Sequence, residues 1–176
     1  MLLLFLLIPT QPRVRGRGPL EAPPLQTSPA HAYDESTLDY FESEILTRAD
    51  LVYRFGIAIT GSTEQAQNLV TATFQSVTKE FSKFIRIRDF NVTGYLLAEC
   101  WRVYSTQGRS GYQGLNDETQ KLVGTLPTES RVTLYAVDVA GLTPADAARA
   151  FGTSEKDVRV KLAAARRALL SSQGDV

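Results

Sequence analysis

The sequence contains very few of the side chains that build catalytic and metal centres. Among its 176 residues there is one cysteine, Cys100, and one histidine, His31, which lies in a proline-rich stretch. A single cysteine excludes an internal disulfide and a multi-cysteine zinc site, and a single histidine leaves no histidine-based triad or metal cluster. No set of nucleophile, base and orienting group can be assembled from the pattern. We therefore expect no enzyme, no metal and no cofactor.

An excess of charge of one sign and a long apolar run are missing as well. Lys and Arg number 19 and Asp and Glu number 19, so the net charge is zero and gives no global sign of nucleic-acid binding. The apolar run Met1–Ile8 is far shorter than the about 20 residues that a transmembrane helix needs. Its basic residues follow it, whereas those of a secretory signal come first. These features predict no membrane insertion and a cytoplasmic location.

The first 33 residues differ in composition from the rest of the chain. They contain six prolines and three arginines, and such a stretch buries too little apolar surface to become ordered. Residues 1–33 are therefore predicted to be a disordered leader.

After this leader the apolar residues recur at helical spacing, and breakers separate the helices. A first helix is predicted after Asp34, and the remaining helices are predicted over Ala49–Thr60, Glu64–Phe84, Thr93–Tyr104, Asp117–Thr125, Thr128–Val139, Pro144–Phe151 and Glu155–Leu170. No segment requires a strand, and the stretch from Phe84 to Phe90 is interpreted as a loop. The predicted fold is all-α, with two small helical domains over residues 34–106 and 117–172, joined by a flexible glycine-containing linker over residues 107–116.

Residues 143–170 have the pattern of a helix-turn-helix. A short helix rich in alanine is followed by Gly152 and then by a longer helix, and these features allow two helices to cross closely after a tight turn. The longer helix carries five bases against two acids, which leaves a local net charge of +3. Two interpretations of this pattern are open: a DNA-binding motif, or a helix pair of a small bundle with a charged outer face.

Two sets of residues match conserved patterns of one protein family. The first set is Leu126-Pro127, Arg131, Leu134, Gly141-Leu142-Thr143, Ala148, Phe151-Gly152, Ser154-Glu155, Val158-Arg159, Lys161-Leu162 and Ala165-Arg166. The second set is Val52-Tyr53-Arg54, Gly61, Ala66, Leu69-Val70, Phe74, Phe81 and Tyr95-Leu96. They resemble the fourth and second conserved regions of bacterial sigma-70 factors, and the extracytoplasmic-function (ECF) group is the most similar class.

The resemblance implies a transcription initiation protein that binds core RNA polymerase at the β′ clamp and promoter DNA, with an anti-sigma factor as a further candidate partner. It assigns contacts with the −35 element to Ser154, Lys156, Asp157, Arg159, Lys161 and Arg166. It assigns contacts with the −10 element to Lys83, Arg86, Arg88 and Asn91. It assigns contacts with the polymerase to Gln67, Asn68, Thr71 and Phe74.

The residues around the −10 assignment support it in part. Residues 81–109 carry five bases against two acids, with aromatic residues interleaved, and this combination suits single-stranded DNA. Two of the side chains favour a structural role instead. Trp101 shares a helix face with Leu97 and Cys100, so it is expected to pack in the core, and Cys100 is expected to be a small buried hydrophobic residue.

The sequence departs from the family pattern at two sites. Gln67 and Asn68 replace an acidic pair, and the loss of interface charge weakens docking onto a basic partner. Asp157 stands where a small hydroxyl residue is usual, and a carboxylate in the major groove repels phosphate. Two hypotheses follow: a divergent sigma factor, or a sigma-like mimic or adaptor that regulates transcription by binding an anti-sigma factor or another protein.

Overall fold

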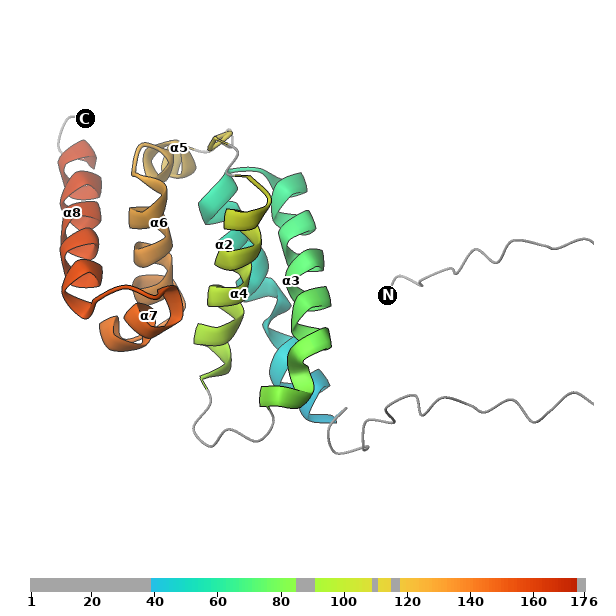
Figure 1. Ribbon diagram of the computed structural model, residues 1–176. Helices are drawn as coiled ribbons and strands as arrows, with labels where there is room; N and C mark the ends of the chain where they lie inside the picture. Colours follow the sequence, from blue (N-terminus) through green and yellow to red (C-terminus); the bar gives the residue numbers. More distant parts are fainter. Residues whose placement is uncertain (1–38, 85–90, 109–110, 115–117, 174–176) are drawn as a thin grey trace, which may run out of the picture. The chain divides into compact units, whose positions relative to one another are not determined.

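The computed structural model describes residues 39–84, 91–108, 111–114 and 118–173 (Figure 1). These residues form helices, turns and connecting segments and no strand, which confirms the prediction of an all-α fold. The predicted leader, residues 1–33, lies outside the described part.

Three α-helices make up most of the first block of the fold. A π-turn, η1 (Phe41–Ile45), and a 3₁₀-turn, η2 (Leu46–Arg48), lead into α2 (Ala49–Thr60), α3 (Thr63–Phe84) and α4 (Val92–Thr106). The predicted boundaries of these α-helices agree with the structure to within two residues. The predicted first helix differs from the structure, since it is interrupted by the wider turn η1, whose last residue, Ile45, is buried.

The second block contains shorter helices and the helix-turn-helix. Its elements are α5 (Glu118–Gly124), α6 (Thr128–Leu134), the π-turn η3 (Tyr135–Val139), α7 (Pro144–Phe151) and α8 (Glu155–Gln173). One continuous helix was predicted over Thr128–Val139, but its second half widens into η3. The amide of Ala140 donates to the carbonyl oxygen of Tyr135 at 2.9 Å, and the widened turn leaves Tyr135 buried.

One hydrophobic core contains residues of both blocks. Phe55 of α2 is completely buried, and its ring centroid lies 5.4 Å from that of Tyr135 and 6.2 Å from that of Phe151. The Tyr135 hydroxyl donates to the carbonyl oxygen of Leu51 at 3.0 Å. Trp101 is partly buried and packs against this core, as expected from its helix face. Whether the two blocks separate in solution stays a prediction.

Arg131 of α6 is a buried cation that links backbone segments of both blocks. Its Nε and one Nη donate to the carbonyl oxygens of Ala58 and Ile59, each at 3.0 Å, in the last turn of α2. The other Nη donates to the carbonyl oxygens of Leu126 and Gly124. Because the side chain is buried, the pKa of its guanidinium is lowered. One planar fork thus satisfies carbonyl groups that their own helices leave unpaired.

Within the predicted linker, residues 111–114 contact the end of α2 and the first turn of α5. The amide of Gln113 donates to the carbonyl oxygen of Thr60 at 2.9 Å, and the hydroxyl of Tyr112 donates to that of Gln120 at 2.9 Å. The guanidinium of Arg131 lies over the Tyr112 ring, 4.4 Å from its centroid. A cation over an aromatic face is attracted to it, so this segment covers the buried arginine.

We expect the substitution Arg131→Met to lower the free energy of unfolding by about 3 kcal/mol or more, because it leaves several buried carbonyl oxygens without a donor. Urea denaturation followed by circular dichroism measures this loss. Arg131→Lys should recover only a part of it, since an ammonium lacks the planar fork. Arg149→Met, which removes an exposed ion pair with Asp146, is the matched control, and its effect should stay within about 1 kcal/mol. Equal effects of the two methionine variants would contradict the role of Arg131.

Cys100 of α4 is completely buried, as expected, and burial raises the pKa of its thiol to about 12. The thiolate is the reactive form, and a pKa of about 12 in place of 9.0 reduces its population at pH 8 by roughly 1000-fold. We therefore expect a thiol reagent such as dithionitrobenzoate to label the folded protein far more slowly than the protein in urea. Equal rates in the two conditions would show that Cys100 is accessible.

Candidate nucleic-acid interface

The turn between α7 and α8 is built by local capping. The Thr143 hydroxyl accepts from the amide of Asp146 at 3.1 Å at the start of α7, and Pro144 occupies the first position of that helix. Gly152 ends α7 with a φ of 64°, a left-handed conformation that glycine adopts without steric cost. These features fix the direction in which α8 leaves the turn.

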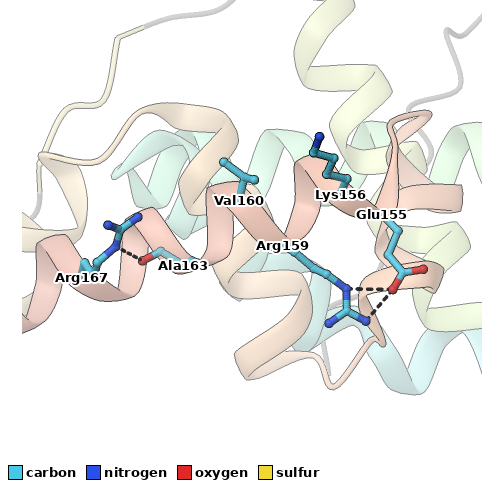
Figure 2. A pocket seen from close by; sticks show the side chains of 6 residues that line it. All are labelled: Glu155, Lys156, Arg159, Val160, Ala163 and Arg167. Carbon is cyan, nitrogen blue, oxygen red and sulfur yellow. Dashed lines mark hydrogen bonds and ion pairs between the residues drawn. The ribbon is translucent and has the colours of Figure 1, made fainter.

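One face of α8 is buried and the other is exposed. Val158, Leu162 and Ala165 are buried, with exposed fractions of 0%, 5% and 1%. The exposed face forms a shallow hollow, shown in Figure 2, lined by Glu155, Lys156, Arg159, Val160, Ala163 and Arg167. All six residues belong to α8 itself, so this outward face projects from the helix-turn-helix.

The outward face combines positive charge with exposed apolar groups. Arg159 donates to one carboxylate oxygen of Glu155 from Nε at 2.9 Å and from Nη2 at 2.5 Å, and Figure 2 shows this pair. Arg167 donates from Nε to the carbonyl oxygen of Ala163 at 3.2 Å. Val160 lies between the two arginines along the helix and is 57% exposed. The face therefore offers guanidinium donors and a methyl-bearing surface at once.

Two bases that were assigned to the −35 contact form ion pairs with acids of neighbouring elements. Lys161 forms an ion pair with Glu129 of α6 at 2.6 Å. The Nε of Arg166 donates to the carboxylate of Asp138 in η3 at 3.0 Å, and this hydrogen bond raises the pKa of the guanidinium. The structure thus places Lys156 and Arg159 on one face and Lys161 and Arg166 on another.

Ser154 and Asp157 form the start of α8. The amide of Asp157 donates to the Ser154 hydroxyl at 3.1 Å, and the Asp157 carboxylate accepts from the Thr153 hydroxyl at 3.2 Å. An acid in the first turn of a helix is also favoured by the helix dipole. This local cap accounts for a carboxylate at a position where the family pattern has a small hydroxyl residue.

Arg167 is the cation of this face that the −35 assignment left out. It lies four residues after Ala163, seven after Val160 and eleven after Lys156, a spacing that keeps all four residues on one side of a helix. This helical spacing can be read from the sequence, but the −35 assignment followed the family pattern, which contains Arg166.

The residues assigned to the −10 contact are only partly described. Lys83 lies in the last turn of α3, and Arg86 and Arg88 lie outside the described residues. Asn91 caps α4, because its side-chain oxygen accepts from the amide of Gly94 at 2.9 Å. The assignment of these residues to the −10 contact therefore stays a prediction.

The α3–α4 surface next to this region carries acidic groups. Burial, together with the carboxylates of Glu99 and Glu80, raises the pKa of Tyr95 to about 12. Arg102 donates to Glu99 at 2.5 Å, and this hydrogen bond lowers the pKa of that carboxyl. The positive charge of Arg102 is therefore neutralised locally, and the surface is less favourable to phosphate than the sequence suggested.

The four residues assigned to the polymerase contact lie on α3 but not in one hollow. Gln67 and Thr71 are exposed and line a groove between α2 and α3 together with Tyr53. Asn68 is also exposed but lines a different hollow, next to Tyr104 of α4. Phe74 is partly buried and packs against the core. Gln67 and Thr71 therefore form the accessible part of this assignment.

Comparison with known proteins finds a family that the C-terminal part of the chain resembles. A family model for Sigma-70, region 4, matches residues 116–169. The matched residues contain the helix-turn-helix and the outward face of α8. No curated protein matches the chain.

Two solved structures share the fold over most of the chain. The first is the sigma factor RpoE in complex with the anti-sigma factor NepR from Bartonella quintana, with a TM-score of 0.67 and 16% identity over 77% of this chain and 97% of that one. The second is the PhyRSL–NepR complex from Sphingomonas sp. Fr1, with a TM-score of 0.62 and 20% identity over 74% of this chain and 87% of that one. The fold is therefore that of sigma regions 2 and 4.

Two further findings concern the described residues alone. None of their helices is long and apolar enough to span a bilayer. No group of three or more histidine, cysteine, aspartate or glutamate side chains among them could hold a metal ion.

Proposed function

We propose that this protein is an ECF-type sigma factor that acts in the cytoplasm, binds core RNA polymerase and reads promoter DNA with the outward face of α8. One observation carries the proposal: Lys156, Arg159 and Arg167 share an exposed face of the second helix of a sigma-70 region 4 domain. In a helix-turn-helix the second helix enters the major groove, and its N-terminal residues contact base edges. Arginine and lysine on that face supply both base and phosphate contacts.

The charge arrangement supports DNA as the partner of this face. The protein as a whole has no net charge, but Glu129 and Asp138 pair with Lys161 and Arg166, which lie outside the outward face. Three cations therefore remain on the outward face, against the single carboxylate of Glu155. Such a local excess of positive charge attracts phosphate even where the net charge is zero.

Neighbouring arginines provide a matched test of the DNA contact. We expect Arg167→Ala to weaken binding to every promoter-like duplex and to lower the slope of log K against log salt by about 0.9, the contribution of one phosphate contact. Arg166→Ala removes the same charge from the adjacent position, yet it should change the slope much less because its guanidinium is held by Asp138. Fluorescence anisotropy across a salt series measures both slopes. Equal slopes for the two variants would contradict the proposed orientation of α8.

A second candidate function is a sigma-like mimic that binds an anti-sigma factor. Both similar structures contain NepR, which is an anti-sigma factor in the first of them. Amides also replace the acidic pair on α3, and Phe55, Tyr135 and Phe151 join the two blocks in one core. These observations favour a protein partner that recognises both blocks together.

Binding to core RNA polymerase separates the two candidates. A sigma factor should form a complex with core enzyme at low salt, and Gln67→Glu should tighten this complex mainly by faster association, since rim charges steer encounter. Asn68 lines a different hollow from Gln67, so Asn68→Glu should change the association rate less. Biolayer interferometry with immobilised core enzyme measures both rates. If neither the wild type nor Gln67→Glu forms a complex, the sigma-factor proposal is wrong and the mimic remains.

A further inference from the structure

A cavity of about 210 Å³ lies between α4 of the first block and the helices α6, α7 and α8 of the second. It is lined by Trp101, Glu129, Val132, Thr133, Phe151, Thr153 and Lys161. Among these residues only Lys161 belongs to a contact assigned from the sequence. A cavity of about 150 Å³ is large enough to bind benzene, so this one has room for a single substituted aromatic ring.

The apolar walls of this cavity are held in place by neighbouring side chains. Trp101 stacks on Tyr104, with ring centroids 5.6 Å apart. Phe151 stacks on the buried Phe55 at 6.2 Å, with an interplanar angle of 18°. Val132 is only 3% exposed. Because these walls are already ordered, a ligand that packs against them immobilises few further side chains. Two aromatic walls favour a flat aromatic ligand.

The hydroxyl groups of the cavity can accept hydrogen bonds from a ligand but not donate them. Thr133 is 5% exposed, and its hydroxyl donates to the carbonyl oxygen of Glu129 at 2.8 Å. The Thr153 hydroxyl donates to the carboxylate of Asp157 at 3.2 Å. A hydroxyl has one proton and two acceptor positions, so the proton of each is already used. The two threonine oxygens therefore select a ligand that donates an O–H or N–H.

The two charged groups of the cavity pair with each other. The Nζ of Lys161 lies 2.6 Å from a carboxylate oxygen of Glu129, and the two side chains are 34% and 52% exposed. This ion pair leaves the cavity without net charge. A ligand with a charge of its own would lose hydration there without gaining a free counter-charge. The cavity therefore favours a neutral ligand.

We propose that this cavity binds a small neutral aromatic molecule with one hydrogen-bond donor, such as a phenol, whose ring packs against Trp101 and Phe151 and whose O–H donates to Thr133. This inference is independent of the proposed function, since neither DNA nor polymerase takes part in it. A ligand at this position contacts both blocks at once. Its binding therefore favours the packed arrangement of the blocks over any arrangement in which they separate.

The only tryptophan of the protein, Trp101, lines the cavity, so its fluorescence reports binding directly. We expect the emission of the full-length protein to change with phenol concentration and to saturate, with a Kd of about 1 mM, an affinity that a ligand of this size can reach. N-acetyltryptophanamide is the control for collisional quenching, which does not saturate. Toluene has a methyl group in place of the phenol hydroxyl, so the ratio of the two Kd values isolates the hydrogen bond.

Variants of one threonine test the acceptor. Thr133→Val should weaken the binding of phenol about fivefold, the loss of one hydrogen bond, and should not weaken the binding of toluene. Thr133→Ser keeps the hydroxyl and should retain the wild-type ratio of the two Kd values. Thr78→Val is the matched control. The Thr78 hydroxyl makes the same kind of backbone hydrogen bond, to the carbonyl oxygen of Phe74 at 2.8 Å, but Thr78 is exposed on α3, outside the cavity. Its variant should bind both ligands as the wild type does.

Three results would overturn the inference. If phenol acts on the protein only as it acts on N-acetyltryptophanamide, the cavity binds no aromatic ring. If Thr133→Val leaves the ratio of the phenol and toluene Kd values unchanged, Thr133 is not the acceptor and the proposed ligand class is wrong. If benzoate or benzylammonium binds more tightly than phenol, Lys161 or Glu129 anchors the ligand and the cavity is not selective for neutral molecules. Each of these results leaves the proposed function standing, because binding to DNA and to core RNA polymerase is measured separately.

Discussion

The fold depends on the burial of one cation among carbonyl groups. Arg131 is 3% exposed and brings positive charge to the carbonyl ends of α2 and to the segment after α5, where helix dipoles and unpaired oxygens favour it. A buried charge is costly without partners, and here five acceptors compensate for that cost. Because these acceptors belong to segments about seventy residues apart in the chain, one guanidinium joins the last turn of α2 to the segment between α5 and α6.

The prediction of the all-α fold succeeded because its information is local. Helical spacing, the Thr143 cap and the turn glycine Gly152 each depend on residues close together in the chain, so all three can be recognised in the sequence. The outward face was harder to predict for a physical reason. Whether Lys161 or Arg166 is available to DNA depends on acids of α6 and η3 that lie about thirty residues away in the chain. Helical periodicity identifies candidate faces, but packing decides which face is exposed.

The charges of α8 therefore have two different roles. Asp157 and Ser154 cap the start of the helix, and Lys161 and Arg166 form ion pairs with acids of α6 and η3. The remaining outward cations are few, which agrees with a protein whose overall charge is zero. A recognition helix of this kind relies on the placement of individual side chains more than on a strong general attraction to phosphate.

The contact of Tyr112 with two distant glycines also constrains how the sequence can change during evolution. A β-carbon at Gly61 would lie 2.8 Å from the Tyr112 ring, and a β-carbon at Gly124 would also overlap it. Gly61 has a further restriction, because its φ of 66° disfavours any side chain. A homologue with a small residue at position 112 is thus expected to tolerate alanine at position 124. Position 61 is expected to stay glycine whether or not position 112 is aromatic. Positions 112 and 124 are therefore coupled through one aromatic ring, whereas backbone geometry alone restricts position 61.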